Sequence, residues 1–157
     1  MIEGVEIYYL KSIPDSRGRI LHFMRKNSSM FEDFDIQEVY FSVIYPGAIK
    51  AWHRHKRMTL NYVVPIGNIK LVLYDGRADS KTAYDVQEIY LGENCPHQLV
   101  RIPPLIWNGY TTVDGKLSLV ANITDFTHDP DEIERKDPNN FVSDDSIPYE
   151  WFTSNYG

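Results

Sequence analysis

Cysteine is almost absent from this chain, since Cys95 is the only one among 157 residues. A disulfide bond within the chain is therefore excluded, and a reducing compartment is the natural environment. Long apolar runs are also missing, because no stretch approaches the roughly 18 residues of a membrane-spanning helix. The first residues, MIEGVEIYYLKSIPD, carry acids where a secretory signal would carry basic residues. We expect a cytoplasmic protein that does not interact with a membrane.

An excess of positive charge is lacking as well. The formal net charge of −6 argues against broad nucleic-acid binding. The chain is 43% hydrophobic and 13% aromatic, which is typical of a globular protein. Its length fits one domain that covers residues 1–157. A local basic cluster could still hold a phosphate group, and it consists of Lys50, Arg54, Lys56 and Arg57.

Helical signals are scarce, and the clearest one is DPDEIERK at residues 129–136, where Pro130 suits the first helical position. Short runs rich in β-branched and aromatic residues dominate instead. They cover residues 5–10, 37–45, 60–66, 68–75, 85–92, 97–102, 109–113 and 117–126. Turn signals separate these runs about every ten residues, which favours an antiparallel sandwich or barrel. The segment TTVDGKLSLV at residues 111–120 predicts a hairpin with a tight Asp-Gly turn.

Two histidines lie two residues apart in KAWHRHKRMTLNYV, residues 50–63. On a strand, His53 and His55 would share one face, so both imidazoles could enter one pocket. Three interpretations follow. The pair could bind a metal, one histidine could be a general base, or both could be ordinary polar residues of a strand.

The metal interpretation lacks further ligands. The spacing from Gly47 to the two histidines matches the first half of a metal-binding cupin pattern. However, the glutamate position of that pattern holds Thr59 or Leu60, and its third histidine position holds Asn108. Two nitrogen ligands make a poor site for a divalent metal, so we expect no metal ion here.

Five segments, in order along the chain, resemble the dTDP-4-dehydrorhamnose 3,5-epimerase family. They are DSRG (15–18), PGAIKAWHRH (46–55), GNIKLVLYDGR (67–77), IPPLIWNGY (102–110) and NITDFTHDPDEIERKDPN (122–139). Members of this family are cupin-type jelly rolls. The resemblance therefore implies an all-β jelly-roll sandwich or barrel with a short C-terminal helical segment.

The resemblance also implies a chemistry. The family's substrates are nucleoside-diphosphate 4-keto-6-deoxy sugars, whose keto group acidifies the protons at C3 and C5. A neutral imidazole removes such a proton, and a buried aspartate orients the imidazole. By this resemblance His53 is the base, Asp137 is its partner, and Lys50 lies near the keto oxygen. No cofactor is implied. The residues expected to bind substrate are Arg17, Glu38, His55, Lys56, Thr59 and Asn108.

A homodimer is implied too, with the N-terminal strand GVEIYYL added to the neighbour's sheet and Arg17 reaching a phosphate across the interface. Three departures from the family pattern matter. This chain has Thr59 where the family has the lysine that stabilises the enolate. It has Ala121 where the family has its catalytic tyrosine, and Asn108 where the family has a histidine.

Three functions therefore remain open. The first is a sugar-nucleotide epimerase that acts at C3, C5 or both, in deoxysugar or surface-polysaccharide biosynthesis. The second is a 3,4-ketoisomerase of the cupin group, because HRHK at residues 53–56 matches its H-x-H-K segment. The third is a sugar-nucleotide-binding protein without catalysis.

Overall fold

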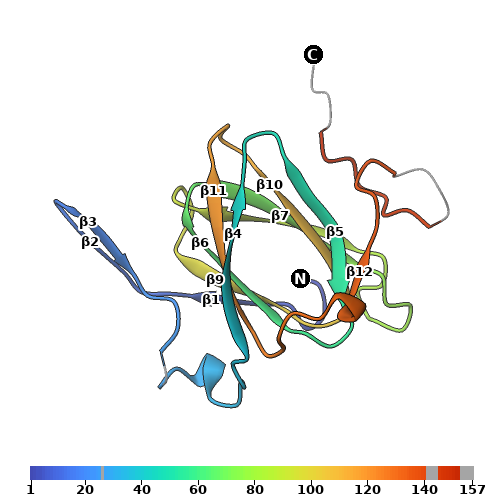
Figure 1. Ribbon diagram of the computed structural model, residues 1–157, viewed down its shortest axis with the longest axis horizontal. Coiled ribbons are helices and arrows are strands. Elements are labelled where there is room, and N and C mark those ends of the chain that lie inside the picture. Colours follow the sequence, from blue (N-terminus) through green and yellow to red (C-terminus); the bar gives the residue numbers. More distant parts are fainter. Residues whose placement is uncertain (26, 141–144, 153–157) are drawn as a thin grey trace.

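Two five-stranded antiparallel sheets face each other in the computed structural model, which describes residues 1–25, 27–140 and 145–152 (Figure 1). The first sheet has the order β1 (Glu6–Tyr9), β9 (Gln98–Ile102), β6 (Leu60–Ile66), β11 (Ser118–Thr124), β4 (Glu38–Ile44). The second has the order β12 (Ile133–Arg135), β5 (Ile49–His55), β10 (Ile106–Thr112), β7 (Asn68–Asp75), β8 (Val86–Gly92). The predicted all-β sandwich is confirmed.

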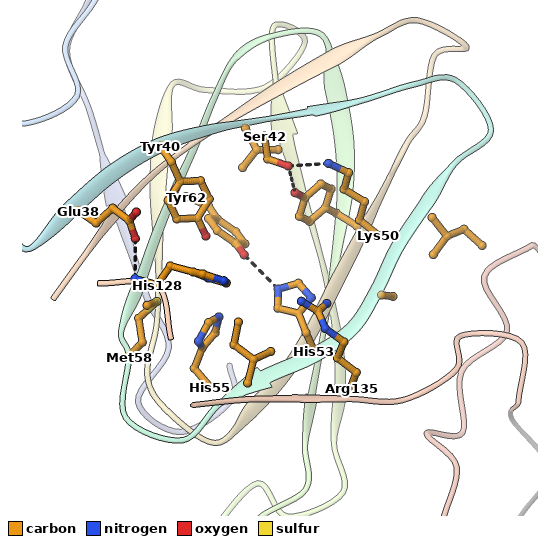
Figure 2. A pocket seen from close by; sticks show the side chains of 15 residues that line it. Glu38, Tyr40, Ser42, Lys50, His53, His55, Met58, Tyr62, His128 and Arg135 are labelled. Atoms are coloured by element: carbon orange, nitrogen blue, oxygen red, sulfur yellow. Dashed lines mark hydrogen bonds between the residues drawn. The ribbon is translucent and has the colours of Figure 1, made fainter. Parts of the chain in front are cut away.

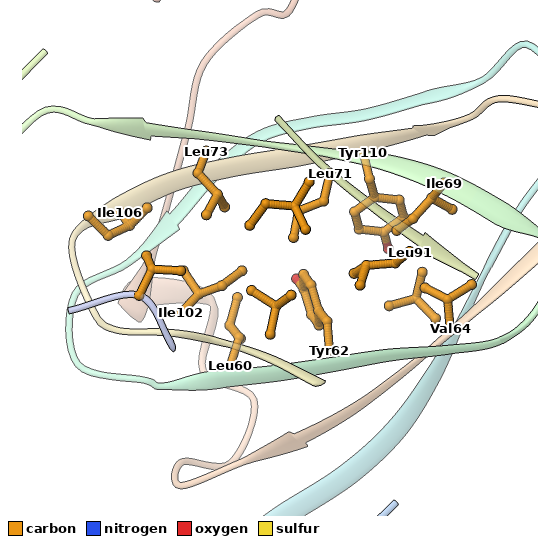
Figure 3. Close-up of a cluster of buried hydrophobic side chains, with 14 of the residues drawn as sticks. Leu60, Tyr62, Val64, Ile69, Leu71, Leu73, Leu91, Ile102, Ile106 and Tyr110 are labelled. Atoms are coloured by element: carbon orange, nitrogen blue, oxygen red, sulfur yellow. The ribbon is translucent and has the colours of Figure 1, made fainter. Parts of the chain in front are cut away.

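The core lies between the two sheets because alternate residues of each strand point inward. On β7, Ile69, Leu71 and Leu73 are fully buried and face the β6 residues Leu60 and Val64 (Figure 3). The other face of the second sheet is covered as well. There the C-terminal residues Ile147 and Trp151 pack in one cluster with Trp52, Val72 and Trp107.

The hairpin predicted at residues 111–120 is wrong. The strand β10 pairs with β5 and β7 in the second sheet, whereas β11 pairs with β4 and β6 in the first. The Asp114-Gly115 turn therefore carries the chain from one sheet to the other. A turn signal is local, but the partner of each strand is decided by the core that its apolar face can join.

The N-terminal region forms an edge strand and a projecting hairpin. Strand β1 pairs with β9 of its own chain and forms one edge of the first sheet, and its addition to a neighbour's sheet stays a prediction. The next two strands, β2 (Ser12–Asp15) and β3 (Gly18–Leu21), form a separate hairpin that projects from the sandwich (Figure 1). The resemblance segment DSRG forms the tip of this hairpin, which we call the arm.

The expected C-terminal helical segment shrinks to one 3-10 turn, η2 (Pro130–Glu132), followed by the short strand β12. Pro130 begins the turn as predicted, and the Asp129 side chain caps it by accepting a hydrogen bond from the backbone N–H of Asp131 at 3.0 Å. The other turn is η1 (Ser29–Phe31). Within the described residues, no helix has the length and apolar character needed to cross a membrane.

Candidate active site

A pocket of about 530 Å³ opens between the two sheets (Figure 2). Strand β5 contributes His53 and His55 to it, and β12 contributes Arg135. Across the pocket, β4 contributes Tyr40 and β6 contributes Tyr62. The two β5 imidazoles therefore lie opposite the phenol groups of Tyr40 and Tyr62.

Strand geometry explains the histidine pair. His53 and His55 are two residues apart on β5, so they share its inner face as predicted, and both line the pocket. Their ring centroids are 6.0 Å apart and the rings are nearly perpendicular. The two side chains have different partners, and this difference assigns them different chemistry.

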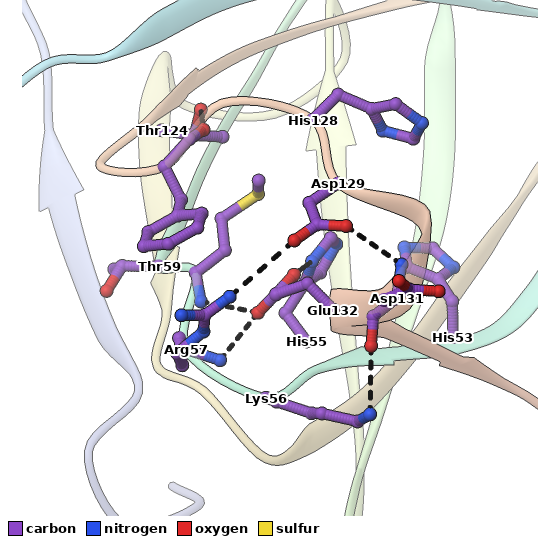
Figure 4. Close-up of polar contacts among 12 residues, drawn as sticks. His53, His55, Lys56, Arg57, Thr59, Thr124, His128, Asp129, Asp131 and Glu132 are labelled. Atoms are coloured by element: carbon purple, nitrogen blue, oxygen red, sulfur yellow. Dashed lines mark hydrogen bonds and ion pairs between the residues drawn. The ribbon is translucent and has the colours of Figure 1, made fainter.

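His55 is paired with a buried carboxylate. Its Nδ1 lies 2.6 Å from Oε2 of Glu132, and the Glu132 side chain is fully buried (Figure 4). The other carboxylate oxygen accepts hydrogen bonds from the backbone N–H groups of Arg57 and Met58, at 2.5 and 2.8 Å. With Nδ1 donating its proton to Glu132, the unprotonated Nε2 of His55 is the nitrogen that can accept a proton.

The charge of Glu132 is secured by these bonds. Burial alone would raise its pKa, but the hydrogen bonds from His55 and the two backbone N–H groups outweigh burial and hold the pKa below its ordinary value. An ionised Glu132 stabilises the imidazolium that forms when His55 accepts a proton. This arrangement is that of a general base with an orienting carboxylate.

His53 has polar neighbours but no acidic partner in the described part of the chain. Its Nε2 is 3.4 Å from the hydroxyl of Tyr62, which is also 3.4 Å from Oδ1 of Asn108. Burial, with smaller effects from the neighbouring His55, Arg135 and Lys50 side chains, lowers the pKa of His53 to about 3. His53 is therefore neutral at pH 7 and has no carboxylate partner among the described residues.

Hydroxyl groups line the pocket from both sheets, with Tyr40 and Ser42 on β4 and Tyr110 on β10. Ser42 Oγ accepts hydrogen bonds from Lys50 Nζ at 2.8 Å and from the Tyr110 hydroxyl at 2.9 Å. The Tyr40 oxygen accepts a hydrogen bond of 2.8 Å from the amide of Asn122, so the Tyr40 proton must point elsewhere. Burial raises the pKa of Tyr40, and it raises that of Tyr110 to about 12, so both phenols keep their protons at neutral pH.

Several predicted site residues meet in this pocket. Lys50, His53, His55 and Glu38 line it, and Glu38 also accepts a hydrogen bond from the backbone N–H of His128 at 3.0 Å. Asn108 is fully buried beneath the pocket, where its amide donates to the carbonyl of His53 at 3.1 Å. Asn108 thus supports the strand that carries the histidines.

The predicted pairing of Asp137 with His53 is corrected. Strand β12 places Arg135 directly opposite His53, and the strand ends there. Asp137 is exposed and accepts hydrogen bonds from the backbone and side-chain amide of Asn139, at 2.9 and 3.2 Å. The buried carboxylate comes instead from Glu132, and its partner is the second histidine.

Three other predicted residues lie away from the pocket wall. Lys56 is exposed and donates to the carbonyl of Asp131 at 2.9 Å. The backbone N–H of Thr59 donates to Asp125 at 2.7 Å, which ties β6 to the loop after β11. Arg17 is at the tip of the arm, where it forms an ion pair with Asp15. None of the three lines the pocket of this single chain.

The sequence interpretation missed Glu132, Arg135, Tyr40 and His128. Glu132 and Arg135 belong to DPDEIERK, where the predicted helix is replaced by a 3-10 turn that ends at Glu132 and a short strand that ends at Arg135, so two different elements direct the two side chains. Tyr40 alternates along β4 with the apolar residues Val39, Phe41 and Val43, which are exposed, so a rule that turns apolar residues inward would have placed Tyr40 on the outer face. Among the described residues, no group of three histidine, cysteine or acidic side chains is arranged to hold a metal ion. The metal-free site remains a prediction.

The fold and site define a class: a cupin-type β-sandwich with an acid–base pocket between its sheets. The chain belongs to the family described as "FdtA: WxcM-like, C-terminal", which matches residues 3–144. It is a divergent relative of the sugar-nucleotide epimerases, as the sequence predicted. The dTDP-4-dehydrorhamnose 3,5-epimerase of Bacillus anthracis, at 20% identity, shares the fold with a TM-score of 0.73 over 84% of this chain and 78% of that enzyme.

Closer relatives are similar over most of their length. A dTDP sugar isomerase from Desulfovibrio desulfuricans is 38% identical, with a TM-score of 0.87 over 96% of this chain and 92% of that structure. The spore coat polysaccharide biosynthesis protein SpsL of Bacillus subtilis is 32% identical over 98% of both chains. The probable low-salt glycan biosynthesis epimerase Agl13 of Haloferax volcanii is 34% identical over 83% of this chain and 85% of its own.

Proposed function

We propose that this protein is a sugar-nucleotide epimerase that acts on a nucleoside-diphosphate 4-keto-6-deoxy sugar in polysaccharide or glycan biosynthesis. The observation that carries the proposal is the 2.6 Å hydrogen bond that joins His55, which lines the pocket of about 530 Å³, to Glu132, which is buried behind it. The relatives named as a dTDP sugar isomerase and a glycan biosynthesis epimerase support the substrate class and the reaction class.

The first step is proton abstraction next to the keto group. A C–H bond at C3 or C5 breaks, its proton moves to Nε2 of His55, and its electron pair leaves a negative charge on the keto oxygen. Glu132 stabilises the imidazolium, and such acid–base help typically contributes ~10²–10⁴ in rate. His53 is the base that the sequence indicated, but its low pKa and its lack of a carboxylate partner favour His55 for this step.

The second step decides the product. Inversion requires a proton from the opposite side of the sugar, and Tyr40 lies on the wall opposite the histidines (Figure 2). Because Asn122 donates to the Tyr40 oxygen, the phenolic proton is available to the pocket. We assign Tyr40 the role of the tyrosine that the family carries at the position of Ala121.

A second candidate is the 3,4-ketoisomerase reaction, in which the carbonyl moves from C4 to C3. One observation favours it: His53 and His55 line the pocket from the same strand face. A pair of bases on one side could move a proton from C3 to C4, and the proton of the C3 hydroxyl to the C4 oxygen, without help from the opposite wall. Both candidates share the first step and differ in the carbon that receives the proton.

The test is incubation with dTDP-4-keto-6-deoxyglucose, and with its GDP, UDP and CDP counterparts, in deuterated water. Product NMR distinguishes the outcomes. Deuterium at C3 or C5 with an inverted centre supports the epimerase. A 3-keto product supports the ketoisomerase. Tight binding without exchange or conversion for any substrate would overturn both and support a binding protein without catalysis.

We also propose a cytoplasmic homodimer. The outer face of β4 exposes Val39, Phe41 and Val43, and β4 is an edge strand. Contiguous apolar surface on an edge strand indicates a protein partner. The projecting arm, which carries Arg17 at its tip, could then reach the pocket of a second copy, where Arg17 would contact a phosphate.

A further inference from the structure

The pocket contains a cation whose role the sequence did not indicate. Strand β12 runs antiparallel to β5 with Arg135 directly opposite His53 and Ile133 opposite His55. Both β12 residues line the pocket, whereas Glu134 between them pairs with Arg54 outside it. Figure 2 shows the Arg135 side chain beside the ring of His53.

Arg135 differs from the two neighbouring cations Arg54 and Lys136, which both have acidic partners. Arg54 forms an ion pair with Glu134, and Lys136 forms one with Asp145. In the described part of the chain, Arg135 forms no such pair, and its charge acts on His53 instead. A guanidinium that faces a pocket without a carboxylate partner keeps its donors for an anionic ligand.

The proposed reaction creates an anion at this place. When a histidine removes a proton next to the carbonyl, negative charge develops on the keto oxygen. The family uses a lysine for this charge, but the corresponding Thr59 lies outside the pocket wall. Lys50 is the other pocket cation, and its ammonium group is already hydrogen-bonded to Ser42 across the pocket.

We propose that Arg135 is the catalytic residue that stabilises the enolate oxygen, in place of the family's lysine. The inference rests on the proposed proton abstraction. Arg135 then binds the negative charge that forms on the keto oxygen in the transition state. It does not bind the diphosphate, whose charge is the same before and after the reaction.

The test compares wild type with Arg135→Met, Arg135→Lys and the matched control Arg54→Met, which removes a cation from the outer face of the same strand pair. Deuterium exchange into the substrate gives kcat and KM, and calorimetry with thymidine diphosphate alone gives the affinity for the charged part of the ligand.

We expect Arg135→Met to lower kcat by about 10²-fold, as for loss of one oxyanion donor. KM and thymidine diphosphate affinity should change little. Arg135→Lys should recover part of kcat, because it restores the charge without the planar fork.

Two results would overturn the inference while leaving the proposed function intact. One is a wild-type kcat in Arg135→Met. The other is a raised KM and weakened thymidine diphosphate binding with kcat unchanged at saturation, which would make Arg135 a phosphate contact. Absence of exchange in the wild type with every substrate is a different result, because it would overturn the proposed function itself.

Discussion

Nδ1 of His55 and Oε2 of Glu132 lie 2.6 Å apart although 77 residues separate them in the chain. The contact exists because η2 turns Glu132 inward just before β12 pairs with β5. Two backbone N–H groups at the end of β5 fix the second carboxylate oxygen, so the carboxylate has little freedom to rotate. The base is therefore oriented by the same bonds that fasten β12 to the sandwich.

Glu132→Gln should lower the rate of substrate deuterium exchange by ~10²–10⁴-fold, because a neutral amide cannot stabilise the imidazolium of His55. The matched control is Asp137→Asn, which changes an exposed acid five residues later and should leave the rate near wild type. Rates are taken per folded protein, checked by circular dichroism. The reverse result, with Asp137→Asn inactive and Glu132→Gln active, would restore the pairing that the sequence predicted.

Tyr40→Phe should separate the two steps of the reaction. His55 can still exchange the proton on its own side, so deuterium exchange without inversion should persist. Inversion should slow by about 10²-fold, because the proton donor on the opposite side is lost. Tyr45→Phe, an exposed tyrosine just beyond the end of β4, is the control. Equal loss of exchange and inversion in Tyr40→Phe would argue against this division of roles.

Much of the fold was predictable because strand signals are local. β-branched and aromatic runs, broken by turn residues, located most strands of the two sheets. The pairing was less accessible: β10 and β11 flank an Asp-Gly turn, yet they lie in different sheets. Which sheet a strand joins depends on packing across the core, and a short window of sequence does not contain that information.

The candidate site, like the fold, was only partly predictable from the sequence. The shared face of His53 and His55 follows from the two-residue period of a strand and was predicted. The partner carboxylate was not, because the segment after Thr124 offers six acids within thirteen residues, Asp125, Asp129, Asp131, Glu132, Glu134 and Asp137. Which of them pairs with a histidine depends on where η2 ends and β12 begins. A shift of one residue there would exchange the inner and outer faces.

The low pKa of His53 predicts a defined pH dependence of stability. In the unfolded chain this histidine titrates near its ordinary value, whereas in the folded protein it stays neutral down to a pKa of about 3. Between these two values the unfolded state binds more protons, so acidification favours unfolding. Through this histidine alone, the free energy of unfolding should be about 2 kcal/mol lower at pH 5 than at pH 7.5.

The measurement is urea unfolding of wild type and His53→Gln at pH 7.5 and pH 5.0. The wild type should lose more of its free energy of unfolding on acidification than the variant does. Loss of the Glu132 charge also destabilises the fold in acid, because the folded-state pKa of this group is lowered. That contribution is present in both proteins and cancels in the comparison. An identical pH dependence would show that His53 is not held neutral by the fold.

The exposed face of β4 predicts how the dimer can be broken. The Phe41 side chain is 66% exposed between Val39 and Val43 on the same strand face. Phe41→Glu should shift the protein from dimer to monomer in sedimentation experiments, because a buried unpaired carboxylate opposes association. The matched control is Val86→Glu on β8, an exposed apolar residue on an edge strand of the other sheet, which should remain dimeric.

If Arg17 of one copy contributes to the pocket of the other, the Phe41→Glu monomer should also show a raised KM with His55 and Glu132 intact. A wild-type protein that sediments as a monomer would contradict the proposed dimer directly.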